Sequence, residues 1–272
     1  MKRLRYLIIT TLLTLSATAG HPRLLTPPRA RNIKQIRSKV IAKPKAHPRP
    51  RPQAAPTPIG TTPHLITGIP KSGTHLLKKV AEALTGMHAT WIKRYTGTYK
   101  EINYRAVQQA MRSRQTLLSA HLHGTPENIE VIRKYDLKTV LIYRDPRDQA
   151  VSLSYYLHRM NPRARQMFGN NLMNLDLGVE KISQQELLTL IIGKLAESYA
   201  LFTALLAEPT ILAIKFEDLV GARGGGSDEA SIHAIAKIAE QLTGTADERN
   251  VHEVAARLFG GTLTFRKGQI GS

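Results

Sequence analysis

The sequence predicts an α/β domain built on one parallel sheet with helices on both faces. Short apolar runs, such as residues 65–67 and 139–143, alternate with stretches in which apolar residues recur at helical spacing. Strands separated by helices form parallel sheets. The first run also leads into a turn containing Gly68, Lys71 and Gly73, after which a helix begins. Such a strand–turn–helix unit is typical of a phosphate site, because the turn and the helix N-terminus present backbone N–H groups and the lysine adds a charge.

The remaining elements follow from apolar spacing and from helix start and stop signals. Pro126 and Pro146 each stand at the first turn of a helix, and Asp145 is an N-cap for the second of these. In chain order we expect helices over 72–85, 102–114, 125–135, 146 onward, 184–207, 231–242 and 250–259, and strands at 65–67, 116–118, 139–143 and 210–214. Residues 221–226 are glycine-rich and are expected to form a flexible loop.

Composition sets the outer limits. The chain has 272 residues, which fits one domain with an appendage, and it has no cysteine, which excludes disulfides, thiolate metal sites and a cysteine nucleophile. The formal net charge of +19 is unevenly spread. Residues 1–60 hold thirteen lysines and arginines and no acid, which leaves 26 basic against 20 acidic residues in the rest. The body is therefore only mildly basic, which suits an anionic nucleotide.

The basic N-terminal segment divides in two. Residues 1–20 combine Lys2, Arg3 and Arg5 with an uncharged run and a final Ala17–Ala19 small-residue site, which is the pattern of a secretory signal. Export or membrane association through this segment is expected, and an organellar or cytoplasmic location stays open. Residues 21–63 alternate proline with charge and are expected to be a disordered linker, or alternatively a polyanion-binding arm. We expect no specific nucleic-acid partner. The folded domain is predicted at 64–272.

A second anion site is predicted where the strand at 139–143 ends. Arg144 follows this strand and Ser152 lies on the second turn of the next helix, so both can contact one anion. Ligands of open α/β sheets bind at the carboxyl ends of the strands. By residues alone, Arg144 can also belong to a solvated cluster at a helix start, and the Lys71 turn can be a plain connection capped by Ser72 or Thr74.

Four segments together resemble the sulfotransferases that use 3′-phosphoadenosine 5′-phosphosulfate (PAPS). Residues Pro70–Thr74 resemble the family's 5′-phosphosulfate loop, and Arg144 with Ser152 resembles its 3′-phosphate site. Residues Phe265–Gly268, with Gly271, resemble its late basic element, and Ser119–Leu122 resembles the segment with the catalytic histidine. The resemblance implies a P-loop-like sulfotransferase fold and transfer of a sulfuryl group from PAPS to a hydroxyl or amine. It implies no metal.

The resemblance also assigns roles. His121 is the general base, although ten histidines are present and His123 lies only two residues away. Lys71 stabilises the charge on the leaving phosphate, and Phe216 offers an aromatic face to the donor. The remaining donor-binding residues are Ser72, Gly73, Thr74 and His75 at the 5′-phosphate, and Arg144, Ser152, Arg266, Lys267 and Gly268 at the 3′-phosphate.

Several positions depart from the family pattern. Ser119 replaces a frequent lysine, Leu76 a tryptophan that stacks on adenine, and Phe216 a frequent tyrosine. The chain ends at Ser272 before the usual Asp-Trp pair and dimerisation segment, so the oligomeric state stays open. The acceptor is a small molecule, a glycan or a lipid. Residues 87–118 and 158–183 are expected to border its pocket, and they contain Trp91, Tyr95, Tyr99, Tyr104, Met160, Phe168 and Met173.

Two other classes of function remain. A small-molecule kinase would use the same lysine loop, but Asp145 and Asp148 are better explained as helix-start residues than as a magnesium ligand. A non-catalytic polyanion-binding protein would use the basic arm. A kinase would require ATP and Mg²⁺, whereas a binding protein would tolerate loss of His121.

Overall fold

The structure, a computed structural model, describes residues 63–113, 117–173 and 182–258. The predicted signal at 1–20, almost all of the linker at 21–63 and the basic element Phe265–Gly268 lie outside the described residues and stay predictions. In the described part, none of the helices combines the length and apolar character needed to span a membrane.

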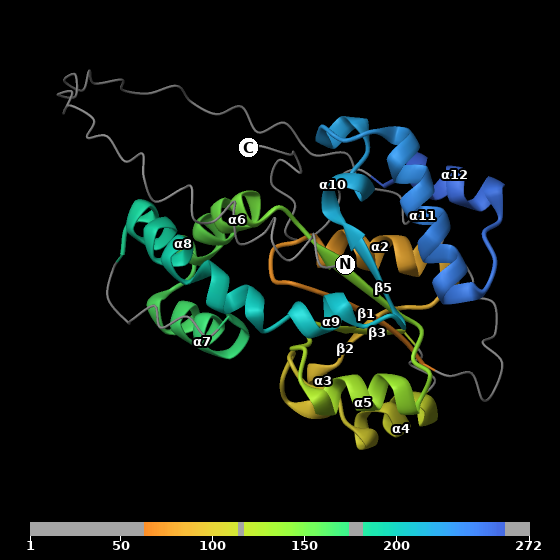
Figure 1. Cartoon of the computed structure of the whole chain (residues 1–272), viewed down its shortest axis with the longest axis horizontal. Helices are drawn as coiled ribbons and strands as arrows, with labels where there is room; N and C mark the ends of the chain where they lie inside the picture. The colour runs from red at the N-terminus through yellow and green to blue at the C-terminus, as the bar shows by residue number, and fades with distance from the viewer. Residues whose placement is uncertain (1–62, 114–116, 174–181, 259–272) are drawn as a thin grey trace, which may run out of the picture. The chain divides into compact units, whose positions relative to one another are not determined.

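The described residues form one five-stranded sheet in which every pair of neighbouring strands is parallel (Figure 1). The strand order is β2-β3-β1-β4-β5. The central strand β1 pairs Ile66 with Ser119 of β3 and with Val140 of β4. Parallel pairing brings the carboxyl ends of these three strands to one edge. The strands are β1 (His64–Gly68), β2 (Thr90–Trp91), β3 (Leu117–Ala120), β4 (Thr139–Tyr143) and β5 (Ile211–Lys215).

Helices cover both faces of the sheet, as predicted. Successive strand residues point to opposite faces, and apolar side chains on both faces are buried under helices. Ile66 and Leu117 belong to a core shared with α2 (Thr74–Thr85), α11 (Asp228–Thr243) and α12 (Glu248–Ala256). Leu65 and Leu118 belong to a second core on the other face. This second core is completed by α4 (Tyr104–Arg112), α5 (Pro126–Lys134) and α9 (Thr203–Ala207).

The other helices lie beside or between these layers. Figure 1 shows α6 (Pro146–His158), α7 (Pro162–Met173) and α8 (Gln184–Ala200) grouped together. Ser183 and Glu186 begin α8 with a capping box, in which each side chain accepts a hydrogen bond from the other's backbone N–H. Short turns complete the fold: α3 (Lys93–Thr96), α10 (Phe216–Leu219) and a 3₁₀ turn at Ala222–Gly224.

Two sequence expectations about these elements are wrong, and some elements, β2 and α7 among them, have no counterpart in the prediction. The helix expected over 184–207 is divided, because α8 ends at Ala200 and Phe202 turns into the core, where it is fully buried. The helix expected from Ser72 begins at Thr74, because Gly73 has a φ of 99° and cannot belong to a helix. Helix α7 was not predicted, since its sequence interrupts apolar residues with Arg163, Gly169 and two asparagines.

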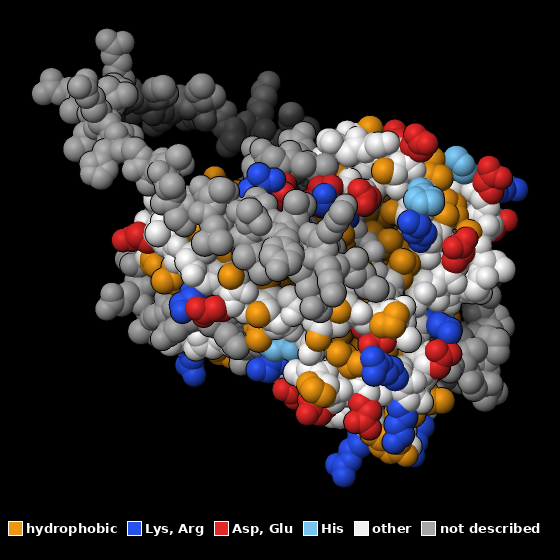
Figure 2. All heavy atoms as spheres, viewed as in Figure 1, with side chains coloured by type: hydrophobic (Ala, Val, Ile, Leu, Met, Phe, Trp, Pro, Cys, Tyr) orange, Lys and Arg blue, Asp and Glu red, His pale blue; other side chains and the backbone are white. Residues whose placement is uncertain are grey.

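Charges are mixed on the part of the surface that Figure 2 shows. Lysine, arginine, aspartate and glutamate side chains are interspersed there, with apolar side chains between them. This agrees with the small excess of basic residues outside residues 1–60.

Candidate active site

The loop between β1 and α2 has an unusual backbone. Lys71 has a φ of 70° and Gly73 a φ of 99°. A positive φ is costly for a residue with a side chain, and such residues gather at functional sites. The loop is closed by a hydrogen bond of 3.0 Å from the Ser72 N–H to the Ile69 carbonyl. The first backbone N–H groups of α2 follow directly, and these have no acceptor within a helix.

Both glycines of this loop are required by close packing. A Cβ on Gly68 would lie 2.5 Å from Thr74 Oγ1 and 2.7 Å from Ile142 Cγ2. A Cβ on Gly73 would lie 2.6 Å from the Phe216 ring. The loop is therefore pressed against the end of β4 and against the segment after β5. From α6, the Gln149 side chain donates a hydrogen bond of 2.7 Å to the Pro70 carbonyl and fixes the other side of the loop.

Two hydroxyl groups in this loop have unused hydrogen-bonding capacity. Ser72 and Thr74 are buried, and neither Ser72 Oγ nor Thr74 Oγ1 has a hydrogen-bond partner among the described residues. Buried polar atoms are nearly always paired in folded proteins. With the Lys71 ammonium and a helix N-terminus close in the chain, these hydroxyls fit the oxygens of an anionic group.

His121 is bound to the same loop. Its Nδ1 lies 2.6 Å from the Gly68 carbonyl oxygen. A carbonyl can only accept, so Nδ1 carries the hydrogen and Nε2 keeps a free lone pair. Burial lowers the pKa of His121 to about 4, and the nearby His75 and Lys71 add to this shift while the Gly68 hydrogen bond opposes it. The ring is therefore neutral at pH 7, as a general base must be.

Aromatic rings surround His121 on the side of β2. The Trp91 ring centroid lies 5.3 Å from the centroids of both His121 and Tyr99, and Tyr99 lies 6.3 Å from His121. His75 packs edge-on against Trp91 at 5.7 Å. Burial also lowers the pKa of His75, followed in importance by the charges of Lys71 and Lys78.

The other aromatic residues expected at the acceptor pocket are divided. Phe168 of α7 packs at 5.3 Å against Tyr156, whose ring centroid is 4.1 Å from the Lys71 Nζ. Tyr104 is 51% exposed and packs against Tyr135 at the end of α5. Tyr95 packs on the core that contains α4. Of the expected set, Trp91, Tyr99 and Phe168 therefore lie near the lysine loop or His121, and Tyr95 and Tyr104 pack elsewhere.

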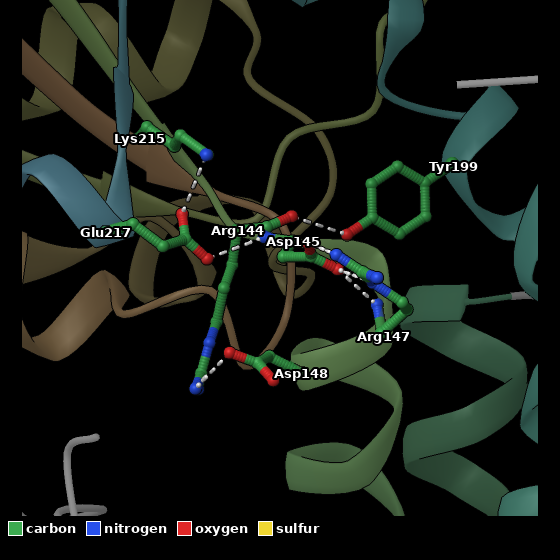
Figure 3. A network of polar contacts seen from close by, with 7 residues as sticks. All are labelled: Arg144, Asp145, Arg147, Asp148, Tyr199, Lys215 and Glu217. Atoms are coloured by element: carbon green, nitrogen blue, oxygen red, sulfur yellow. Dashed lines mark hydrogen bonds and ion pairs between the residues drawn. The ribbon is translucent and has the colours of Figure 1, made fainter. Parts of the chain in front are cut away.

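Arg144 extends from the end of β4 over the Phe216 ring, with 4.4 Å between its Cζ and the ring centroid. Its Nη2 lies 3.4 Å from Asp148 Oδ2 on the first turn of α6 (Figure 3). Ser152 is four residues beyond Asp148 on the same helix face. Phe216 thus contacts both Gly73 and Arg144, which places the lysine loop and the arginine side by side.

The structure brings most of the sequence-predicted residues to one edge of the sheet. Those placed there are Lys71, Ser72, Gly73, Thr74, His75, His121, Arg144, Ser152 and Phe216. Arg266, Lys267 and Gly268 lie outside the described residues. Leu76 belongs to the core under α2, and the Ser119 hydroxyl is buried with no hydrogen-bond partner in the described part of the chain. Over that same part, no group of three or more His, Asp or Glu side chains is arranged to hold a metal ion.

Four further residues at this edge were not identified from the sequence. Gln149 and Tyr156 lie on α6 at helical spacing from Ser152, which is a signal that the sequence contained. Glu217 follows Phe216 directly, and its Oε1 accepts a hydrogen bond from the Asp145 N–H. Tyr199, on α8, had no such signal, because only the packing of α8 on α6 brings it to Arg144.

A known protein family and several solved structures are similar to this chain. The sequence model of the sulfotransferase domain family matches residues 61–222. Retinol dehydratase in a complex with retinol and PAP is similar in structure, with a TM-score of 0.50 and 15% identity over 79% of this chain and 76% of that one. No curated protein matches the chain in sequence.

Two further structures are similar over a smaller part of their length. Mouse sulfotransferase SULT7A1 complexed with PAP has a TM-score of 0.46 and 17% identity, over 72% of this chain and 63% of that one. Retinol dehydratase with androsterone and inactive cofactor PAP has a TM-score of 0.45 and 15% identity, over 72% and 64%. In these two comparisons, this chain covers less than two thirds of the length of the other chain.

Proposed function

The chain belongs to the sulfotransferase family, and on this basis we propose that it transfers a sulfuryl group from PAPS to the hydroxyl or amine of a small-molecule acceptor. One observation carries the proposal: His121 Nδ1 is bound to the Gly68 carbonyl, at the start of the loop that contains Lys71. The candidate base and the candidate donor loop are thus held in one rigid unit, which favours a transfer reaction between two bound groups.

The loop residues would bind the 5′ end of the donor. Ser72 and Thr74 offer buried hydroxyl donors, and the N-terminus of α2 offers backbone N–H groups. Arg144 would bind the 3′-phosphate from the end of β4, together with Ser152. Each charge-assisted hydrogen bond of this kind contributes about 1.5–3 kcal/mol. Phe216, which lies between Gly73 and Arg144, would hold the two phosphate sites at a fixed separation.

The donor supplies an activated sulfuryl group, and the protein contributes proton transfer and charge stabilisation. His121 Nε2 accepts the proton of the acceptor hydroxyl as the oxygen forms a bond to sulfur. The bond between sulfur and the bridging phosphate oxygen breaks, and the Lys71 ammonium stabilises the charge that develops on that oxygen. Such a reaction depends mainly on placement and electrostatics.

The acceptor would bind beside the rings of Trp91 and Tyr99, which flank His121. These rings present a flat apolar surface next to the base. A small apolar molecule with one hydroxyl or amine fits such a surface, and this is the acceptor class that we propose.

Calorimetry on the full chain without metal tests the donor site. Adenosine 3′,5′-bisphosphate should bind about 10- to 100-fold more tightly than adenosine 5′-monophosphate, because Arg144 adds at least one charge-assisted hydrogen bond to the 3′-phosphate. Equal affinities would refute a 3′-phosphate site. Tighter binding of ATP that depends on Mg²⁺ would favour the kinase instead.

Three alanine variants test the assigned roles. Arg144→Ala should weaken bisphosphate binding, and Lys71→Ala should weaken both binding and the rate of transfer from radiolabelled PAPS to a panel of phenols, alcohols and amines. His121→Ala should keep bisphosphate binding and lose transfer. An equal loss of nucleotide affinity in all three variants would contradict the roles.

A further inference from the structure

The peptide group between Arg144 and Asp145 is held on both of its polar sides by side chains that are distant in sequence. The Tyr199 hydroxyl, from α8, donates a hydrogen bond of 3.1 Å to the Arg144 carbonyl. The Asp145 N–H donates one of 2.9 Å to Glu217 Oε1, from α10 (Figure 3). This carbonyl and this N–H belong to one planar unit. Two bonds at opposite edges of this planar unit therefore fix its orientation.

Both bonds are shielded from water. Tyr199 and Arg144 are each 8% exposed, and the Glu217 side chain is 11% exposed. Burial raises the pKa of Tyr199 far above its ordinary value, so its hydroxyl remains a donor. The second Glu217 oxygen lies 4.0 Å from the Lys215 ammonium, which keeps a positive charge beside the carboxylate. A shielded bond of this kind is costly to remove, because its partner is left unsatisfied.

The Arg144 side chain extends from the Cα atom at one end of this peptide, so the orientation of the peptide affects the direction of the side chain. The guanidinium group lies over Phe216 and against Asp148, and both contacts require the observed direction of the side chain. The same peptide also begins α6, because the Asp145 carboxylate accepts a hydrogen bond of 2.9 Å from the Arg147 N–H. A rotation of the peptide would therefore move the arginine and the start of the helix that carries Ser152.

We propose that Tyr199 and Glu217 are positioning residues, which hold the Arg144–Asp145 peptide so that Arg144 points at the 3′-phosphate of the bound nucleotide. Neither residue is assigned a contact with the donor or the acceptor. The inference rests on the proposed function, since it requires that Arg144 binds this phosphate. It predicts that the two residues affect one phosphate of the donor and leave the other unaffected.

The test uses Tyr199→Phe, which removes a single oxygen. Calorimetry on the full chain should show a loss of about 3- to 10-fold in affinity for adenosine 3′,5′-bisphosphate. The affinity for adenosine 5′-monophosphate should be unchanged, because that nucleotide lacks the 3′-phosphate. Tyr135→Phe, at the end of α5, is the matched control and should change neither affinity. Glu217→Ala should resemble Tyr199→Phe, whereas Glu217→Gln keeps an acceptor oxygen and should retain most of the affinity.

A double-mutant cycle with Arg144→Ala separates positioning from general stability. If Tyr199 acts through Arg144, Tyr199→Phe should cause no further loss of bisphosphate affinity in the Arg144→Ala protein. An equal loss for both nucleotides, or the same loss with and without Arg144, would overturn the inference.

The two proposals fail in different ways. If the wild-type protein prefers the bisphosphate and Tyr199→Phe retains the full preference, only the positioning role is refuted. If the wild-type protein shows no preference, the 3′-phosphate site and the positioning role are both refuted. Tyr199→Phe carries the test if Glu217→Ala does not fold.

Discussion

The protonation of His121 gives the sharpest test of the site. Lowering the pH from 7.5 to 5.5 would protonate an ordinary histidine but should leave this one neutral. With a pKa of about 4, the ring is about 97% neutral at pH 5.5, whereas a ring with the ordinary value of about 6.5 would be about 9% neutral. The difference is about tenfold in the fraction of neutral ring, the form that the proposed base requires.

The assay is a titration of full-length protein with ¹⁵N-labelled histidine, followed by long-range ¹H–¹⁵N NMR. The protein has ten histidines, and the signal that is missing from His121→Gln identifies the one of interest. It should show hydrogen on Nδ1, as the bond to the Gly68 carbonyl requires, and should not titrate above about pH 5. A midpoint near 6.5, or hydrogen on Nε2, would contradict the lowered pKa and the bond to Gly68.

The same shift affects stability. The unfolded chain takes up a proton on this histidine near pH 6.5, but the folded protein does so only near pH 4. The titration of His121 therefore does not change the free energy of unfolding above pH 6.5. It lowers this free energy by about 3 kcal/mol in total as the pH falls from 6.5 to 4. The loss should be smaller in His121→Gln, as measured by urea unfolding at several pH values. Equal pH dependence in the two proteins would show that this ring titrates normally.

Three substitutions test the packing around the site by urea unfolding. Gly73→Ala should lower the free energy of unfolding by about 2–5 kcal/mol. The new methyl group would lie 2.6 Å from the Phe216 ring, and the φ of 99° at this position is unfavourable for alanine. A change below about 0.5 kcal/mol would contradict this. Asn128→Ala should cost about 2–4 kcal/mol without changing nucleotide affinity, because the buried amide makes three hydrogen bonds to backbone groups; a selective effect on affinity would be unexpected. Lys79→Met should cost about 1–2 kcal/mol and speed hydrogen exchange in α12, because the ammonium is bound to the first two carbonyls after that helix, those of Arg257 and Leu258. Unchanged exchange would show that the lysine does not stabilise this end.

The fold was predictable because its signals are local. Apolar runs such as Thr139–Tyr143 are long enough for a buried strand and too short for a typical helix, and Pro146 after Asp145 marks a helix start. The prediction of one helix over 184–207 was wrong because the end of α8 has no local signal. Its apolar spacing continues through Phe202, and the end of α8 depends on where that side chain packs.

The amino-acid pattern was enough to predict the four longer strands, the lysine loop and the position of Arg144 at a strand end, because these depend on neighbouring residues. The contacts that hold the site together, in contrast, follow from the packing of the whole fold. The bond between Gly68 and His121 joins residues 53 positions apart, and those that hold the Arg144–Asp145 peptide join residues 55 and 72 positions apart. Such contacts depend on strand order and helix packing, which bring one carbonyl or carboxylate out of many within reach, and no local pattern specifies which one.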